Sequence, residues 1–324
     1  MLPRLIETAA KERLPALAIT DHGNMFGAIE FYVEAKKQGV MPIIGCEVYI
    51  APGSRFEKST HGVHEASFHL VLLAKDEEGY QNLMKLVTIA NLEGFYYRPR
   101  IDKEVLSSHS KGLLGLSACL HGEIPNLILA GQIEKAVEVA GNLKEIFGPG
   151  NFYLELMDNM IAEQAKVNKA LLEISQRLSI PVVATNDVHY LGKKEAYAHD
   201  VLLCIQTQTT LDDPNRLRFQ TEEFYFKSPQ EMKELFREVP QAIRETLKIV
   251  EKCSLELSFD RPLLPHFKPP EGKNREAFLR ELCEEGLKRR YTQVTAILKE
   301  RMEYELGIIS KTGYTSYFLI AWDA

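Results

Sequence analysis

A short apolar strand that ends in an acid and an imidazole constrains the fold of this chain most. Ala16–Thr20 is too short for a helix, and it runs directly into Asp21, His22 and Gly23. A short buried run of this kind is typical of a parallel strand. α/β folds place their reactive groups at the carboxyl ends of such strands. Taken alone, Asp21 could equally be a helix N-cap and His22 an ordinary loop residue, so other strand ends must decide.

The composition is that of an ordinary globular protein. The 324 residues are 45% hydrophobic and 26% charged, and the formal net charge of −6 gives no global tendency to bind nucleic acid. No apolar run approaches the ~18 residues of a membrane span, and no signal peptide opens the chain. Five cysteines without a C-x-x-C pair favour a reducing compartment over a disulfide framework or a zinc ribbon. We therefore expect a cytoplasmic protein without a membrane partner.

Strand and helix patterns alternate about six times before residue 190. The strand-like runs cover 16–20, 41–50, 68–74, 113–119, 152–157 and 181–190. This alternation predicts a parallel sheet, and six or more βα units favour a barrel. Helices expected at 194–206 and 229–252 would complete the outer layer. A helix at 2–13 opens the chain, and the strand that should precede it is missing.

The chain divides into three predicted parts. A barrel domain covers 1–260, and a proline-rich linker follows at 261–273. Charged amphipathic helices then occupy 274–324, where the chain stops inside an apolar run. We expect a segment that is cut at both ends of a longer protein.

Potential metal ligands recur at or near the ends of the predicted strands. They are His22, Glu47, His69, Cys119, Asp187 and His189. In a barrel these positions converge on one mouth. A mixed N, O and S donor set suits Zn²⁺, Mn²⁺ or Fe²⁺ better than Mg²⁺ or Ca²⁺. Six ligands exceed what one tetrahedral ion needs, so the pattern predicts two or more clustered ions.

Each of these residues also has a structural explanation. A single histidine such as His69 is more often hydrogen-bonded in the core, and Cys119 alone reads better as a buried thiol. Glu47 is harder to explain this way, because a carboxylate within an apolar strand must be paired or bound to metal. Asp187 and His189 form the strongest local pair, since residues two apart on an extended segment point the same way. The prediction of a metal site rests on the occurrence of all six residues at or near successive strand ends.

Long runs of the sequence resemble one known family. These runs are ALAITDHGNMFGAIEFY, IGCEVY, FHLVLLAKDEEGYQNL, GFYYRPRID, GLSACLHGEIP, ATNDVHYL and LDDPNRLRFQTEEFY. Together they resemble the N-terminal polymerase-and-histidinol-phosphatase (PHP) domain of the bacterial DNA polymerase III alpha subunit. The resemblance implies a distorted seven-stranded β/α (TIM-like) barrel with a cluster of two to three divalent ions at its mouth. The family's metal positions match the six residues above one by one.

The sequence departs from the family in one important respect. The family begins with a strand that bears a His-x-His pair, followed by an acidic ligand, and Met1 falls just after that segment. We therefore expect a barrel that lacks its first strand and, in the chain alone, weak or incomplete metal binding. The part from about Asn274 resembles the start of the polymerase palm. The palm's catalytic aspartates and its Mg²⁺ site would lie beyond Ala324.

The resemblance also implies an activity and its residues. In the intact protein the domain would be a metal-dependent phosphoesterase, here a 3′–5′ proofreading exonuclease that uses Zn²⁺ or Mn²⁺ rather than Mg²⁺. We assign Glu47, Asp187 and His189 as catalytic and place Asp21 behind His22 as its support. The loop residues Tyr97, Arg98 and Arg100 would stack a base and hold a phosphate, unless they form a docking surface.

Other readings of the same sequence remain. The intact subunit would meet primer-template DNA with a single-stranded 3′ end, a sliding clamp, a clamp loader and possibly a separate proofreading exonuclease. The alternative is a catalytically silent module that stabilises the polymerase and docks that exonuclease. A free-standing phosphatase for a small phosphomonoester fits less well, because palm-like helices follow the linker.

Overall fold

A computed structural model describes residues 2–63, 66–259, 265–270 and 272–323. His64, which we read as an ordinary loop histidine, and part of the predicted linker lie outside these residues. The chain forms two compact units, Met1–Glu256 and Leu257–Ala324. Each unit is described by itself.

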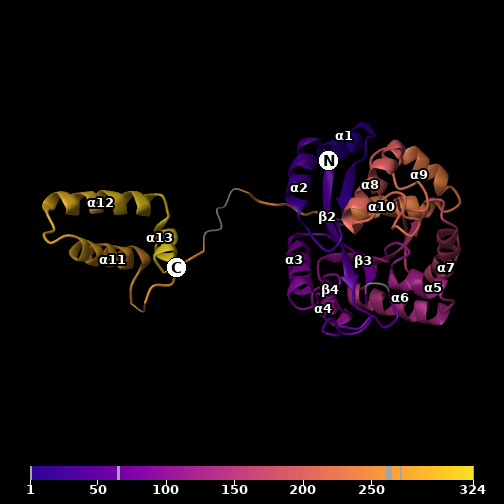
Figure 1. The fold of residues 1–324 in the computed structure, drawn as a ribbon, viewed down its shortest axis with the longest axis horizontal. Helices are drawn as coiled ribbons and strands as arrows, with labels where there is room; N and C mark the ends of the chain where they lie inside the picture. Colours follow the sequence, from indigo (N-terminus) through magenta and orange to yellow (C-terminus); the bar gives the residue numbers. More distant parts are fainter. Residues whose placement is uncertain (1, 64–65, 260–264, 271, 324) are drawn as a thin grey trace. The chain divides into compact units, whose positions relative to one another are not determined.

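One seven-stranded sheet organises the first unit (Figure 1). Its strands are β1 (Ala16–Ile19), β2 (Met41–Ile50), β3 (Phe68–Ala74), β4 (Arg100–Ile101), β5 (Leu113–Leu116), β6 (Phe152–Met157) and β7 (Val182–Thr185). Six of them follow the order β1-β2-β3-β5-β6-β7, and the two-residue β4 pairs with β2 off this path. Within the described residues, β1 and β7 are therefore the end strands.

Helices surround this sheet and supply its outer packing (Figure 1). They are α1 (Leu2–Lys11), α2 (Ala28–Lys37), α3 (Glu77–Leu92), α4 (Lys103–Ser108), α5 (Glu123–Leu129), α6 (Ile133–Phe147), α7 (Ala162–Leu178), α8 (Ala196–Thr207), α9 (Pro229–Leu235) and α10 (Pro240–Lys252), with a 3₁₀ turn at Lys193–Glu195. The predicted helix 229–252 is thus two helices. The second begins at Pro240, whose missing N–H and fixed φ suit a first helical turn.

The sheet is mixed, and this corrects the prediction of a parallel one. β1–β2, β5–β6 and β6–β7 are parallel, but β3 runs antiparallel to both β2 and β5. The reversal at β3 follows from the connection at 51–67, whose described residues contain no α-helix of the kind that usually returns a chain for a parallel pairing.

Alternation along the strands divides the core into two layers. The larger cluster lies between the sheet and the helices and includes Leu72, Leu154 and Leu156. The smaller cluster lies on the opposite, inner face, where Val71 of β3, Tyr153 of β6 and Val183 of β7 meet. The inner face is the one that continues into polar residues at the strand ends.

The sheet is curled, as shown by an interaction between residues that follow its two end strands. His22 follows β1 and His189 follows β7, yet the two interact: burial lowers the pKa of His22, and the charge of His189 acts in the same direction. Across a flat sheet with strands ~4.8 Å apart, six strands would separate these residues by roughly 24 Å. Their interaction requires the inner face to close on itself, as in a barrel.

The second unit is helical. It contains α11 (Arg275–Arg290), α12 (Ala296–Lys311) and α13 (Thr315–Asp323), which enclose a small core around Phe278, Leu306 and Leu319. Asn274 caps α11 and Thr295 caps α12 through their side-chain oxygens. Among the described residues, no helix is long and apolar enough to cross a membrane.

Candidate metal centre

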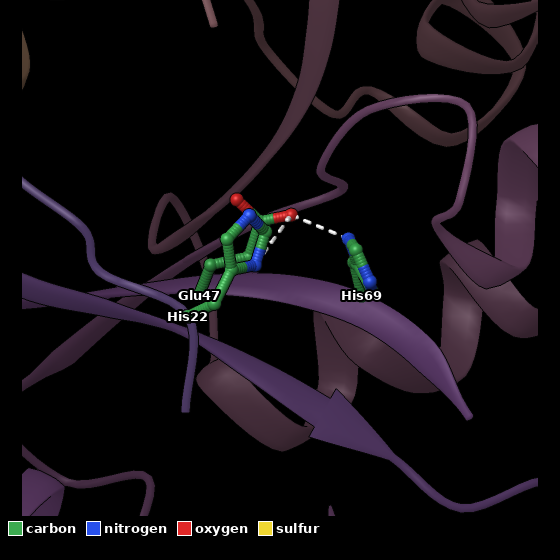
Figure 2. Close-up of side chains that lie close together, drawn as sticks. All are labelled: His22, Glu47 and His69. Atoms are coloured by element: carbon green, nitrogen blue, oxygen red, sulfur yellow. Dashed lines mark ion pairs between the residues drawn. The ribbon is translucent and has the colours of Figure 1, made fainter. Parts of the chain in front are cut away.

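A buried carboxylate between two imidazoles lies at the centre of the site. Glu47 is only 7% exposed although it carries a charge. Its Oε1 lies 2.7 Å from His69 Nδ1 and 3.9 Å from His22 Nδ1. One ligand atom from each of the three residues lies within 4.8 Å of the other two (Figure 2). Such a group can hold a divalent metal ion.

Strand pairing brings these three side chains together. Beyond the end of β1, His22 still pairs with Glu47 of β2 through a parallel bridge. Gly23 N donates to Glu47 O at 2.9 Å, and Glu47 N donates to Asp21 O at 3.0 Å. Gly23 adopts φ +66°, and a Cβ there would come within 2.9 Å of Pro99. The sharp turn after His22 therefore requires glycine.

Cys119 approaches the same carboxylate from β5. Its Sγ lies 3.9 Å from Glu47 Oε1 and 3.8 Å from His69 Nδ1. The predicted strand 113–119 is wrong at its end, because β5 stops at Leu116 and Ala118 turns into the left-handed region at φ +63°. This turn, rather than strand pleating, directs the thiol to the site.

Asp187 and His189 follow β7 and lie within electrostatic reach of Glu47. The predicted extended segment is not formed, since β7 ends at Thr185 and Asp187 has φ +50°. The two side chains still lie together, with His189 Nδ1 at 3.7 Å from Asp187 Oδ1. That Nδ1 is also 2.9 Å from Asp187 O. Donation to this carbonyl leaves Nε2 as the lone-pair nitrogen of His189.

The pKa values of these groups show how strongly they interact. Burial would raise the pKa of Glu47, but the hydrogen bond with His69 and the charges of His22, His69 and His189 outweigh it and lower the pKa. Burial raises the pKa of Asp187 to about 6, against the opposing effect of His189. Burial and the nearby carboxylates raise the pKa of the Cys119 thiol well above its usual value.

The chemistry of the donor set fits a divalent cation. Glu47 and Asp187 place two carboxylates on one buried surface, and each raises the pKa of Cys119. Ligands about 2.0–2.3 Å from one ion lie roughly 3–4.5 Å apart, and the separations around Glu47 Oε1 fall near this range. A cation there would offset the repulsion between the acidic groups and favour the thiolate.

The three predicted substrate residues differ in burial, and Arg100 is the buried one. Arg100 is 1% exposed, and its guanidinium donates to four backbone carbonyl oxygens, those of Gly94, Ala66, Arg55 and Glu57. Its assignment as a phosphate ligand is therefore wrong, because these carbonyls occupy its donors.

Arg98 and Tyr97 have different surroundings from Arg100. The Arg98 guanidinium lies 5.8 Å from the centre of the Tyr49 ring, and its charge contributes to the lowered pKa of His22. Tyr97 is 62% exposed. Asp21 lies within electrostatic reach of His22, and burial raises the pKa of its carboxyl group. A supporting role for Asp21 stays a prediction.

Sequence reasoning missed a layer of buried polar residues behind the site. Glu155 of β6 is 4% exposed, and Asn159 just after β6 is fully buried. Asn159 Nδ2 donates to Asn186 O at 3.2 Å and to Glu223 O at 3.0 Å. Glu155 carries the signal that identified Glu47, a carboxylate within an apolar strand, so the same argument could have found it.

Comparison with known proteins places the chain in a family. Residues 1–159 match the PHP domain family, and residues 277–324 match the family described as the bacterial DNA polymerase III alpha NTPase domain. A solved structure from Bifidobacterium adolescentis, described as that of a metal-dependent phosphoesterase, aligns with a TM-score of 0.37 and 14% identity over 58% of this chain and 82% of its own.

Curated relatives extend over both matched regions. The DNA polymerase III subunit alpha of Treponema pallidum is 44% identical over 99% of this chain, and that of Borreliella burgdorferi is 47% identical over 98%. The Thermus aquaticus subunit is 46% identical over 86%. The chain spans 28% of the length of the first two relatives and 23% of the third. The chain therefore belongs to the bacterial DNA polymerase III alpha subunit family and carries the PHP domain of that family.

Proposed function

We propose that this chain is part of the alpha subunit of a bacterial replicative DNA polymerase, and that its PHP domain hydrolyses phosphodiesters at a DNA 3′ end. The observation that supports the proposal is the close group of His22, Glu47 and His69 with the Cys119 thiol beside it. Asp187 and His189 lie within electrostatic reach of Glu47. Replication and the DNA substrate come from the relatives, whose names describe a DNA polymerase subunit.

The proposed residues divide the work between binding metal and positioning the substrate. His22, Glu47, His69, Cys119, Asp187 and His189 would hold two to three ions, with Zn²⁺ or Mn²⁺ favoured by the nitrogen and sulfur donors. Such ions supply Lewis acidity and lower the pKa of water toward neutrality. Glu47 lies between His22 and His69, and its two carboxylate oxygens would be available to hold metal there.

Arg98 is the residue best placed to contact the scissile phosphate. Its charge reaches His22 at the edge of the site. The partly exposed His22 ring and the exposed Tyr97 mark the open side of the site. A single-stranded end could lie there with a base against Tyr97 and its phosphate toward Arg98.

The intact alpha subunit provides the test. We expect Asp187→Ala to abolish Mn²⁺- or Zn²⁺-dependent shortening of a 5′-labelled single strand while primer extension with Mg²⁺ continues. Asp158→Ala is the matched control, since Asp158 follows β6 as Asp187 follows β7 and its carboxylate caps Met160 N. If Asp187→Ala shortens the strand as fast as the wild type, the assignment is wrong.

The competing proposal is a silent module that stabilises the polymerase. It predicts no metal-dependent shortening by the wild-type subunit and a loss of primer extension when the site is altered, because metal binding and folding are linked. All six ligand positions that the resemblance implies for this chain carry a metal-binding side chain, and this favours the phosphoesterase.

A further inference from the structure

Glu155 is a buried carboxylate that no proposed step uses. It lies on β6, between β5 and β7 in the sheet, and is 4% exposed. Since Tyr153 belongs to the inner cluster, alternation places Glu155 on the same inner face. Burial raises its pKa to about 8, and the charges of Glu47 and Asp187 act in the same direction. A group this costly to bury needs an explanation beyond packing.

The hydrogen bonds of Glu155 run to both neighbouring strand ends. Ala118 N donates to Glu155 Oε2 at 2.7 Å, and Thr185 Oγ1 donates to Glu155 Oε1 at 2.9 Å. The backbone N of Glu155 donates to Ser117 Oγ at 2.8 Å. The Glu155 side chain therefore links the carboxyl ends of β5 and β7 by hydrogen bonds.

Both exits lead to proposed metal ligands through strained backbone. Ala118, at φ +63°, directly precedes Cys119, and Asp187 itself has φ +50° two residues after Thr185. Left-handed conformations are costly for residues other than glycine and persist only when the surroundings fix them. The Glu155 carboxyl supplies such a constraint at Ala118, where it accepts the N–H of the strained residue.

From this geometry we infer that Glu155 is a positioning residue, which sets Cys119 and Asp187 in register for metal without binding the metal itself. The inference rests on the proposed function only in that it treats these two residues as ligands. Glutamine can replace the carboxyl group, because its oxygen can accept from Ala118 N while its amide donates to the rotated Thr185 hydroxyl. Leucine fills a similar volume and offers neither bond.

Hydrogen exchange of the metal-free 324-residue chain tests the inference. At pH 5 we expect Glu155→Leu to accelerate exchange at least tenfold in peptides covering 117–122 and 185–190, and Glu155→Gln to retain the wild-type rates. Asn82→Leu is the control for general destabilisation, since Asn82 is a buried residue of α3 whose side-chain amide donates to Lys111 O. Unchanged rates in Glu155→Leu, or equal acceleration in Asn82→Leu, would overturn the inference.

A second experiment measures the absorption spectra of the same variants with Co²⁺ bound. We expect a thiolate-to-Co²⁺ absorption band from Cys119 in the wild type and in Glu155→Gln, and a weaker band in Glu155→Leu at the same Co²⁺ concentration. A Cys119→Ser variant identifies the band. Absence of the band in the wild type would contradict the metal centre itself, and the exchange comparison would still decide the role of Glu155.

Discussion

The raised pKa of Glu155 leads to a prediction about stability and pH. Its pKa is about 8 in the folded chain, against an ordinary value of 4.5. Between these values the unfolded chain loses a proton that the folded chain keeps, so rising pH destabilises the fold. At about 1.4 kcal/mol per pH unit, the destabilisation at pH 7 is about 3 kcal/mol, and it is small at pH 5.

Glu155→Gln removes this dependence, because an amide does not ionise. The weaker hydrogen bonding of the amide costs about 1 kcal/mol. The metal-free variant should therefore be about 2 kcal/mol more stable than the wild type at pH 7. The corresponding rise in Tm of its first unit is about 4–8 °C. At pH 5 the advantage should vanish.

Calorimetric unfolding with a chelator present, at pH 5 and pH 7, measures this difference. Glu163→Gln makes the same chemical change at an exposed position on α7 and should leave Tm unchanged at both pH values. A Glu155→Gln variant that is less stable than the wild type at pH 7, or equally shifted at both pH values, would refute the reasoning.

Three further predictions concern the site and its supports. Mn²⁺ affinity, measured by titration calorimetry, should fall about tenfold for each pH unit below pH 6, because protons then compete with the ion for Asp187. Above pH 6 the Asp187 carboxylate should add no further pH dependence to the affinity. Arg100→Leu should lower the unfolding free energy by about 3–5 kcal/mol, because two buried and two partly buried hydrogen bonds to backbone carbonyl oxygens are lost; limited proteolysis should then cut within 53–63. Metal analysis should find fewer or more weakly held ions in the 324-residue chain than in the intact subunit; a full, tightly held cluster would contradict this.

Much of the fold follows from local sequence patterns. The strands that contain Glu47 and His69 were predicted with the bounds they have, because long apolar runs between turn residues leave little choice. The direction of β3 was not predictable in the same way. It depends on a connection in which the described residues form no α-helix, and sequence periodicity does not indicate in which direction the next strand runs.

The site was predicted by residue type better than by geometry. Among the described residues, only His22, Glu47 and His69 form a close ligand group, so the set of six stays a prediction; Cys119 and Asp187 follow left-handed backbone that no sequence period encodes. Arg100 was misassigned because a basic residue in an aromatic loop reads the same whether it faces solvent or caps buried carbonyls. Its burial depends on tertiary contacts with the segment from Arg55 to Ala66.

The central claim is that six side chains from the strand ends form one metal centre. Anomalous diffraction from crystals of the chain grown with saturating Mn²⁺ or Zn²⁺ tests it most directly. We expect at least one strong anomalous peak within coordination distance of Glu47 and His69, and its loss in Glu47→Ala. A site without any peak at saturating metal, or ions bound only to other surface residues, would contradict it.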